Sequence, residues 1–391
     1  MTKQQTTYDN VLAVSEGDTA FGFSIMPHLS KGNLTFSPYS IRTALAMVYE
    51  GARGVSAKEI SDVAFIPENI ESRLKGYNEL MHRLNAKNES HVLKSANGLW
   101  VEKQFESNPR YRKTLRDSYQ AMADDADFLN NAEYWRGEIN EWVSDQTEKK
   151  IPELFPQGSI SSDTVVALAN ALYFKGFWEN KFDAELTQKQ DYTLPGNQVV
   201  QVDMMRKGAV EREHKLPKFL YGCFDGFQVA MLPYKGRELK KAVMLAPKGS
   251  DISQLEEVLK QNPSLFRDWV SQLRESEFAR LEIPKHEIRK GFSLNSPLQA
   301  MGIRRIFSNN ADLSGIGEGP LFIGSGYHQA YFKTDEEGSE GAAATGFAVM
   351  RCAVFDKPKP VEFVADKPFL EMIVHQPTDA LLFLNRIVDP R

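Results

Sequence analysis

The sequence predicts an α+β fold in which helices come first and strands follow. Apolar residues recur at helical spacing through about the first 150 of the 391 residues, and short strand-like stretches dominate from about residue 163. No linker, internal repeat or low-complexity segment divides the chain. We therefore expect one large domain spanning residues 1–391.

Three N-terminal segments have the signals of helices. Ser37-Pro38 is a cap followed by a proline in the first turn, and it opens a helix over residues 41–49. A second helix is predicted over residues 57–63. A third, over residues 132–149, has one apolar face, formed by Trp135, Ile139, Trp142 and Val143.

The later part of the chain has the patterns of strands. Residues 164–174 are apolar on both sides of their alternation, which is typical of a strand buried on both faces. Residues 369–374 and 381–387 flank a polar, proline-containing turn and predict a hairpin. Shorter candidate strands lie at residues 229–232, 242–245 and 281–283.

Composition narrows the classes of partner. The chain is 42% hydrophobic and 25% charged, and its formal net charge of -5 is spread along the sequence without acidic or basic blocks. This pattern argues against nucleic acid as a partner, and no apolar run of about 18 residues could span a bilayer. We expect a monomer with neither a nucleic-acid nor a membrane partner.

The N-terminus and the cysteines bear on the compartment. The first residues, MTKQQTTYDNVLAVSEGD, are polar where a secretory signal would be apolar. Cys223 and Cys352 are too few for a disulfide framework and lack the spacing of a metal site. These features predict a cytoplasmic setting, and secretion would require a leader removed before residue 1.

Sequence motifs of enzymes are absent. There is no GxSxG, HExxH, CxxC, P-loop or GxGxxG motif, and the glycines over residues 315–319 have the spacing of a turn. The seven histidines are scattered, with none beside an evident nucleophile. We therefore predict that the chain is not an enzyme and that it has no catalytic residue, metal or cofactor.

The most informative segment covers residues 334–360, TDEEGSEGAAATGFAVMRCAVFDKPKP. It begins with an acidic turn, runs without charge from Gly341 to Met350 and ends in a proline-rich stretch. At strand spacing, one face is small at its start and larger and apolar further on, through Ser339, Gly341, Ala343, Thr345, Phe347 and Val349. Such a strip could insert between two existing strands.

Two other interpretations of this segment compete. It could be an ordinary surface loop, although surface loops are usually more polar. It could also be an alanine-rich helix, but Gly341 and Gly346 would each cost roughly 0.5–1 kcal/mol there.

Several motifs of the chain resemble those of one family, the serpins. Residues 336–345, EEGSEGAAAT, are similar to the serpin hinge EEGxEAAAAT, with Gly341 in place of an alanine. Further similarities occur in the family's order: FSPYSI from Phe36, NALYFKGFW from Asn170, FSNNADLS from Phe307, YHQA from Tyr327 and DKPF from Asp366.

The resemblance implies a fold and a mechanism. A serpin has helices packed on three β-sheets and presents an exposed reactive loop, here about residues 336–360. A protease attacks this loop as a substrate. The cleaved loop then inserts into the central sheet and traps the acyl-enzyme, so a serpin is a suicide-substrate inhibitor.

The resemblance also implies roles for single residues. The hinge comprises Glu336, Glu337, Gly338, Ser339, Glu340, Gly341, Ala342, Ala343, Ala344 and Thr345. The shutter beneath the central sheet matches Ser37, Ser40, Asn170 and His328. Trp178 matches the breach, where the loop enters, and Glu336 is expected to pair with Lys285 and hold the hinge.

Two registers remain open for the cleaved bond. In the common family spacing, the residue before this bond is the seventeenth from Glu336, which gives Cys352-Ala353. A loop one residue shorter gives Arg351-Cys352, a bond that resembles those of several intracellular serpins. Arg351 would fit a trypsin-like protease with an acidic pocket, whereas Cys352 would fit an elastase-like or a cysteine protease.

A non-inhibitory serpin that acts as a carrier or chaperone is the alternative. Hinges of such members tend to hold bulky residues, charged residues or proline. Residues 339–345 are small apart from Glu340, which favours inhibition.

Overall fold

The computed structural model describes residues 3–208, 216–324, 326–339 and 359–391. The helices are α1 (Lys3–Ser15), α2 (Gly17–Ile25), α3 (Pro38–Gly51), α4 (Gly54–Ala64), α5 (Ile70–Leu84), α6 (Pro109–Tyr119), α7 (Phe128–Gln146), α8 (Ile252–Gln261), α9 (Leu265–Gln272) and α10 (Asn295–Met301). The strands are β1 (Leu34–Phe36), β2 (His91–Glu102), β3 (Met122–Ala126), β4 (Val166–Phe177), β5 (Gln188–Thr193), β6 (Val199–Gly208), β7 (Lys218–Phe224), β8 (Phe227–Pro233), β9 (Leu239–Leu245), β10 (Arg274–Pro284), β11 (His286–Ser293), β12 (Tyr327–Thr334), β13 (Gly338–Ser339), β14 (Val361–Val364), β15 (Phe369–His375) and β16 (Ala380–Ile387).

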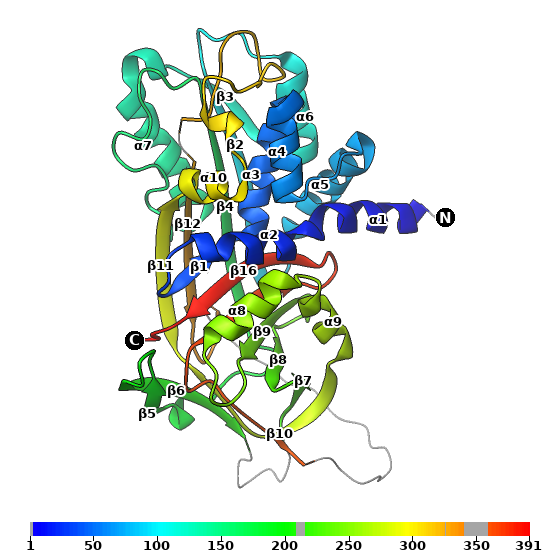
Figure 1. The fold of residues 1–391 in the computed structure, drawn as a ribbon, viewed down its shortest axis with the longest axis vertical. Coiled ribbons are helices and arrows are strands. Elements are labelled where there is room, and N and C mark those ends of the chain that lie inside the picture. Colours follow the sequence, from blue (N-terminus) through cyan, green and yellow to red (C-terminus); the bar gives the residue numbers. More distant parts are fainter. Residues whose placement is uncertain (1–2, 209–215, 325, 340–358) are drawn as a thin grey trace.

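These strands form three sheets within the described residues, as the resemblance to serpins implies. The largest has the order β1-β16-β15-β9-β8-β7-β10-β6-β5, with β14 beside β10. The others are β11-β12 and β13-β4-β2-β3. In Figure 1 helices α3 to α7 gather in the upper half of the molecule, and β5 to β10 lie in the lower half.

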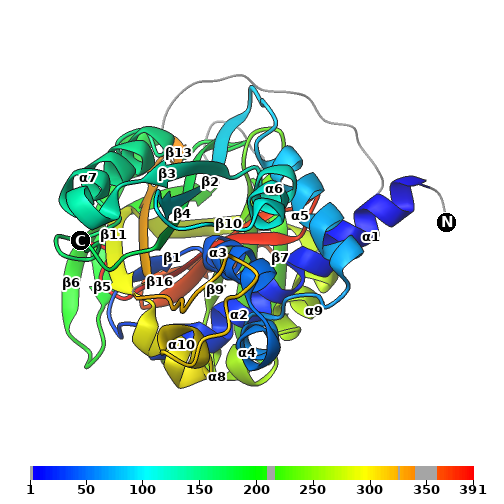
Figure 2. The same ribbon diagram turned by 90° about the horizontal axis from the view of Figure 1, so that it is seen from above.

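β4 separates two hydrophobic cores. Alternate residues of a strand point to opposite faces, and Ala167, Ala169 and Ala171 belong to a small core beneath α7. Leu172 and Phe174 belong to the large core on the other face, where α3 packs. Figure 2 shows α7 and α3 on opposite sides of β4.

Helix α3 is built as the sequence predicts. Ser37 is its N-cap, with its side chain accepting from the Ser40 amide at 3.0 Å, and Pro38 is the first helical residue. α4 begins before the predicted residues 57–63. α7 ends at Gln146, earlier than predicted, and begins at Phe128 because Asp127 caps it.

Helices dominate the first 150 residues as predicted, but the sequence did not indicate the strands that lie among them. The strand β2 runs for 12 residues, and β1 and β3 also lie in this region. Asn97-Gly98 in the middle of β2 has the composition of a turn, which obscures the strand. Here Gly98 is needed because an added Cβ would lie 2.4 Å from the Trp100 ring.

The predicted C-terminal strands are all present, with small changes of boundary. The hairpin of β15 and β16 pairs Phe369 with Ile387 and His375 with Ala380. The strand predicted at residues 281–283 is longer, extending over β10, because both of its edges pair with other strands.

Candidate functional site

The candidate site is the slot, which we define as the space between β4 and β12. β12 pairs with β11 on one edge, and β4 pairs with β2 along its length. In the described part of the chain no ladder joins β4 to β12. The facing edges therefore offer backbone groups that another strand could pair with.

A cavity of about 420 Å³ lies in the slot. Its lining combines apolar side chains of α3 with residues of β4 and β12, and it includes Ile41, Ala44, Val48, Val166, Leu168 and Tyr327. The connection from α7 to β4 also contributes residues 155, 158–161 and 163–165. Close-packed interiors rarely leave so much room, so the middle of the slot is unfilled.

Three of the four predicted shutter residues line this cavity: Ser40, Asn170 and His328. The fourth, Ser37, donates its backbone N–H to His328 Nε2 at 3.1 Å. The ring of His328 therefore accepts at Nε2, and burial lowers its pKa to about 3. A neutral imidazole thus joins β12 to the start of α3.

Two buried polar atoms of the shutter have no hydrogen-bond partner among the residues that the structure describes. They are the Ser40 hydroxyl and the Asn170 side-chain oxygen. The Asn170 amide donates to Asn97 at 2.6 Å, and Asn97 in turn donates to the Tyr119 carbonyl at 2.7 Å. Unpaired buried polar groups cost free energy, so this region is less stable than it could be.

The end of the slot beside the last residues of β4, which we call its upper end although it points down in Figure 1, is well bonded. The ring of Trp178 stacks on Tyr234 with centroids 4.7 Å apart, and its Nε1 donates to the Asp335 carbonyl at 2.9 Å. The Trp178 backbone N–H also donates to the Glu337 carbonyl at 3.0 Å. The predicted breach residue therefore contacts the beginning of the hinge.

The predicted ion pair of the hinge is present. Lys285 Nζ lies 2.9 Å from Glu336 Oε2, and the Thr187 hydroxyl donates to the other carboxylate oxygen at 2.8 Å. Burial opposes ionisation of Glu336, but these hydrogen bonds outweigh it and lower the pKa of the carboxyl. Glu337, next along the hinge, pairs with Lys181.

The hinge starts a ladder with β4. Gly338 pairs with Phe177, and Ser339 pairs with Gly176, in antiparallel register. A Cβ at Gly338 would lie 2.1 Å from the Gly176 carbonyl oxygen, so only glycine allows this approach. Ser339 is buried, with its hydroxyl 2.8 Å from that of Tyr234.

The remaining predicted site residues fall outside the described residues. They are Glu340, Gly341, Ala342, Ala343, Ala344 and Thr345 of the hinge, and Arg351, Cys352 and Ala353 at the cleaved bond.

Three residues at the upper end of the slot were not indicated by the sequence motifs. Tyr234, Lys241 and Glu371 all lie there, from strands far apart in sequence. A charged residue inside an apolar strand, such as Glu371 in FLEMIV, is the signal that could have indicated a buried ion pair.

The described part of the chain has neither a metal-binding cluster nor a membrane-spanning helix. No group of three or more His, Cys, Asp or Glu residues there could hold a metal ion. No helix there is both long enough and apolar enough to cross a membrane.

Comparison with known proteins decides the family. A family profile described as "Serpin (serine protease inhibitor)" matches residues 16–390. The chain belongs to the serpin family. Leukocyte elastase inhibitor A of Mus musculus is 36% identical over 96% of this chain and 99% of its own. Leukocyte elastase inhibitor of Bos taurus is 34% identical over 94% and 96%.

Solved serpin structures agree with this assignment. A cleaved serpin named Serpin 42Da is similar with a TM-score of 0.84 and 27% identity, covering 98% of this chain and 100% of its own. Serpin48 of Tenebrio molitor has a TM-score of 0.81 and 27% identity, covering both chains fully. The predicted serpin fold is confirmed, as is the prediction of a protease inhibitor whose partner is a target protease.

Proposed function

We propose that this serpin traps its protease by drawing residues 338–349 into the slot as a new strand beside β4. The two-residue ladder at Gly338 and Ser339 carries this proposal, because it already sets the direction and register of the strand. Beyond it, no strand among the described residues pairs with this edge of β4, and the cavity lies beside it. Insertion would add the missing backbone hydrogen bonds and fill the cavity.

The register indicates how the loop fits. Continuing it residue by residue places Thr345 opposite Asn170, and Val349 opposite Val166 at the start of β4. Directly opposed residues share a face of a sheet. Ser339, Gly341, Ala343, Thr345, Phe347 and Val349 would therefore face α3, with the small residues entering first and the large ones reaching the cavity.

The other face of the inserted strand would hold the charged hinge residue. In the same register Glu340 would come opposite Lys175, which is half-buried on β4, once the loop has inserted. A carboxylate and an ammonium in directly opposed positions stabilise a sheet modestly. The charge of Glu340 would thus be compensated after insertion.

We propose Cys352-Ala353 as the cleaved bond and an elastase-like serine protease as the target. The spacing from Glu336 gives this bond, and curated relatives are named leukocyte elastase inhibitors. Arg351 supports a second candidate, a trypsin-like protease cutting Arg351-Cys352, because a guanidinium pairs well with an acidic pocket. We also propose that the chain forms one domain. The presence of only two cysteines favours a reducing, intracellular setting.

Incubation with pancreatic elastase, trypsin and papain tests the proposal. We expect a complex that survives boiling in detergent with elastase, and mass spectrometry should find cleavage after Cys352. A complex with trypsin and cleavage after Arg351 would support the second register. Complete cleavage by every protease with no complex would overturn inhibition and favour a carrier.

A matched pair of variants tests the register itself. Ala343→Glu would put a glutamate on the inner face of the inserted strand, which we define as the face toward α3, whereas Glu340 would lie on the opposite, outer face. The new charge would be buried against the large core. We expect this variant to be cleaved without trapping the protease. Glu340→Ala, which leaves the inner face intact, should still trap it. Equal behaviour of both variants would contradict the register.

A further inference from the structure

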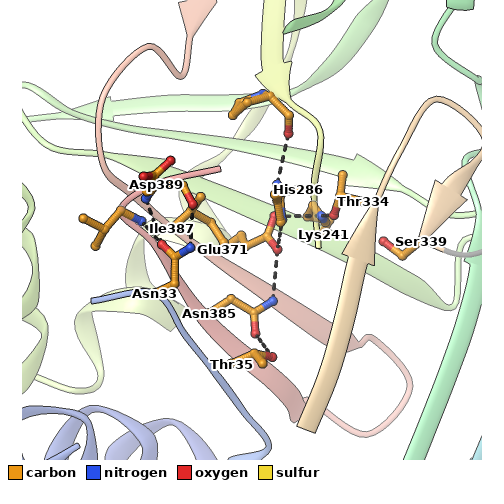
Figure 3. Close-up of polar contacts among 12 residues, drawn as sticks. Asn33, Thr35, Lys241, His286, Thr334, Ser339, Glu371, Asn385, Ile387 and Asp389 are labelled. Atoms are coloured by element: carbon orange, nitrogen blue, oxygen red, sulfur yellow. Dashed lines mark hydrogen bonds and ion pairs between the residues drawn. The ribbon is translucent and has the colours of Figure 1, made fainter. Parts of the chain in front are cut away.

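A cluster of ionisable groups lies fully buried beside the upper end of the slot. Lys241 of β9, His286 of β11 and Glu371 of β15 have side chains with 0% exposure. Lys241 Nζ is 2.7 Å from Glu371 Oε2, and His286 Nε2 is 3.0 Å from Glu371 Oε1. Figure 3 shows the carboxylate between the two basic groups. The cluster joins the largest sheet to the sheet of β11 and β12.

The carboxylate at the centre of the cluster is ionised. Its Oε1 atom also accepts from the Asn385 amide at 3.0 Å, and the Thr35 hydroxyl donates to the Asn385 oxygen at 2.7 Å, which fixes the direction of the amide. Burial penalises the charge of Glu371, but Lys241 and His286 hold its pKa far below the usual range.

The imidazole of His286 has an oxygen atom beside each of its ring nitrogens. Its Nδ1 lies 3.0 Å from the Pro284 carbonyl oxygen, which can only accept a hydrogen bond. Its Nε2 faces the ionised Glu371, which also accepts. The cluster thus places two basic side chains around one carboxylate.

Lys241 connects the cluster to β12, which borders the slot. Its Nζ donates to the Thr334 hydroxyl at 2.5 Å and lies over the rings of Phe332, at 4.9 Å, and Trp178, at 5.5 Å. The faces of these two rings attract the Lys241 ammonium. Thr334 is the last residue of β12, two positions before Glu336. The ammonium therefore fixes the point at which the chain leaves β12 and becomes the hinge.

We propose that Lys241, held by Glu371, is a positioning residue that fixes the end of β12 so that the hinge enters the slot immediately after cleavage. This inference rests on the proposed insertion of the loop. Insertion competes with hydrolysis of the acyl-enzyme, so a hinge that starts from a fixed position favours trapping over release. Without the contact between Lys241 and Thr334, a larger share of the chain would be cleaved without trapping the protease.

Two substitutions at Thr334 isolate the contact. Thr334→Val removes the hydroxyl and keeps the shape, whereas Thr334→Ser keeps the hydroxyl. With a protease that the wild type traps, we expect Thr334→Val to raise the moles of serpin needed per mole of protease by about five-fold. Thr334→Ser should stay close to the wild type. Equal values for the two variants, both folded by circular dichroism, would overturn the proposal.

A second comparison separates positioning from stability. The double variant Lys241→Met/Glu371→Leu replaces the ion pair by apolar groups, a change that buried ion pairs often tolerate. Asp18→Asn weakens another buried pair, Asp18–Arg42, away from the slot. We expect the double variant to trap poorly and Asp18→Asn to trap normally, although it lowers the thermal midpoint. Equal loss of trapping in both would overturn the positioning role.

The wild type provides the reference that distinguishes the two proposals. If the wild type forms no complex with any protease, the proposed function fails and this inference fails with it. If the wild type traps and Thr334→Val traps equally well, only the positioning role of Lys241 is wrong.

Discussion

The two ends of the slot differ in how completely their groups are bonded. At the upper end, Trp178, Glu336 and Ser339 all have partners. In the middle, Ser40 and Asn170 have unpaired polar atoms beside a cavity of about 420 Å³. The bonded end can start insertion, and the unfilled middle supplies the free energy that completes it.

The largest expected effect comes from cutting the loop. Cleavage between Met350 and Ala353 should let residues 340–349 join the two that already pair with β4 and fill the cavity, a gain on the order of 10 kcal/mol. We expect the thermal midpoint measured by calorimetry to rise by about 10–20 °C. An unchanged midpoint would show that the middle of the slot does not drive insertion. Ala343→Glu, cleaved in the same way, is the control and should gain much less.

The next effect concerns His328 in the middle of the slot. Its pKa is lowered to about 3 in the folded state, so between this value and the ordinary value of about 6.5 the unfolded chain binds the proton more readily. The contribution of His328 to the free energy of unfolding is therefore complete above about pH 6.5 and is lost as the pH falls. At pH 5 the free energy of unfolding should be lower by about 2 kcal/mol.

His328→Gln tests this pH dependence, because the amide oxygen can still accept from Ser37. Urea unfolding between pH 7 and pH 5 should show a smaller loss of stability in the variant than in the wild type. Some loss should remain, because burial also lowers the pKa of His375 to about 4. An identical slope in both proteins would contradict the neutral, accepting state of His328.

A smaller effect is expected from filling the cavity. Ala44→Leu adds apolar volume to the middle of the slot, where we expect it to stabilise the intact chain by about 1 kcal/mol. The same side chain would occupy the space needed by the loop, so trapping should decrease. Ala86→Leu, at an exposed position outside the cavity, is the control. More efficient trapping by Ala44→Leu would refute the assigned role of the cavity.

The smallest effect is expected at the upper end. Lys285 is 39% exposed and Glu336 is 12% exposed, so solvent screens their attraction and Lys285→Met should cost less than about 1 kcal/mol. The cost, measured by urea unfolding, should shrink further in high salt. Lys75→Met, which breaks an exposed helix pair with Glu71, provides the comparison. A cost of several kcal/mol would show that this end is also important for global stability.

The sequence predicted local features better than long-range contacts. Ser37-Pro38 and the hairpin of β15 and β16 were correctly predicted, because cap and turn residues act on their own neighbours. The hinge pattern led to the pair of Glu336 and Lys285. Single-residue roles in the shutter stay predictions, although Ser40, Asn170 and His328 do meet at one cavity.

Other features could not be predicted, for physical reasons. β2 contains Asn97-Gly98, whose local preference for a turn is overridden by pairing with β4. The cluster around Glu371 depends on strands that are adjacent only after folding. Neither composition nor spacing shows that a lysine from one strand and a glutamate from another will meet in the interior.

The alanines on one face of β4 have a mechanical consequence. Ala167, Ala169 and Ala171 give the β4 side of the small core a shallow surface, and the edge-to-face contact of Trp142 in α7, with centroids 5.2 Å apart, is made with Trp100 of β2 instead. The segment that links α7 to β4 lines the cavity and must move aside for a new strand. Side chains as small as these offer little resistance to a neighbour that slides along β4. The face of β4 toward α7 therefore opposes sideways movement less than the face that carries Leu172 and Phe174.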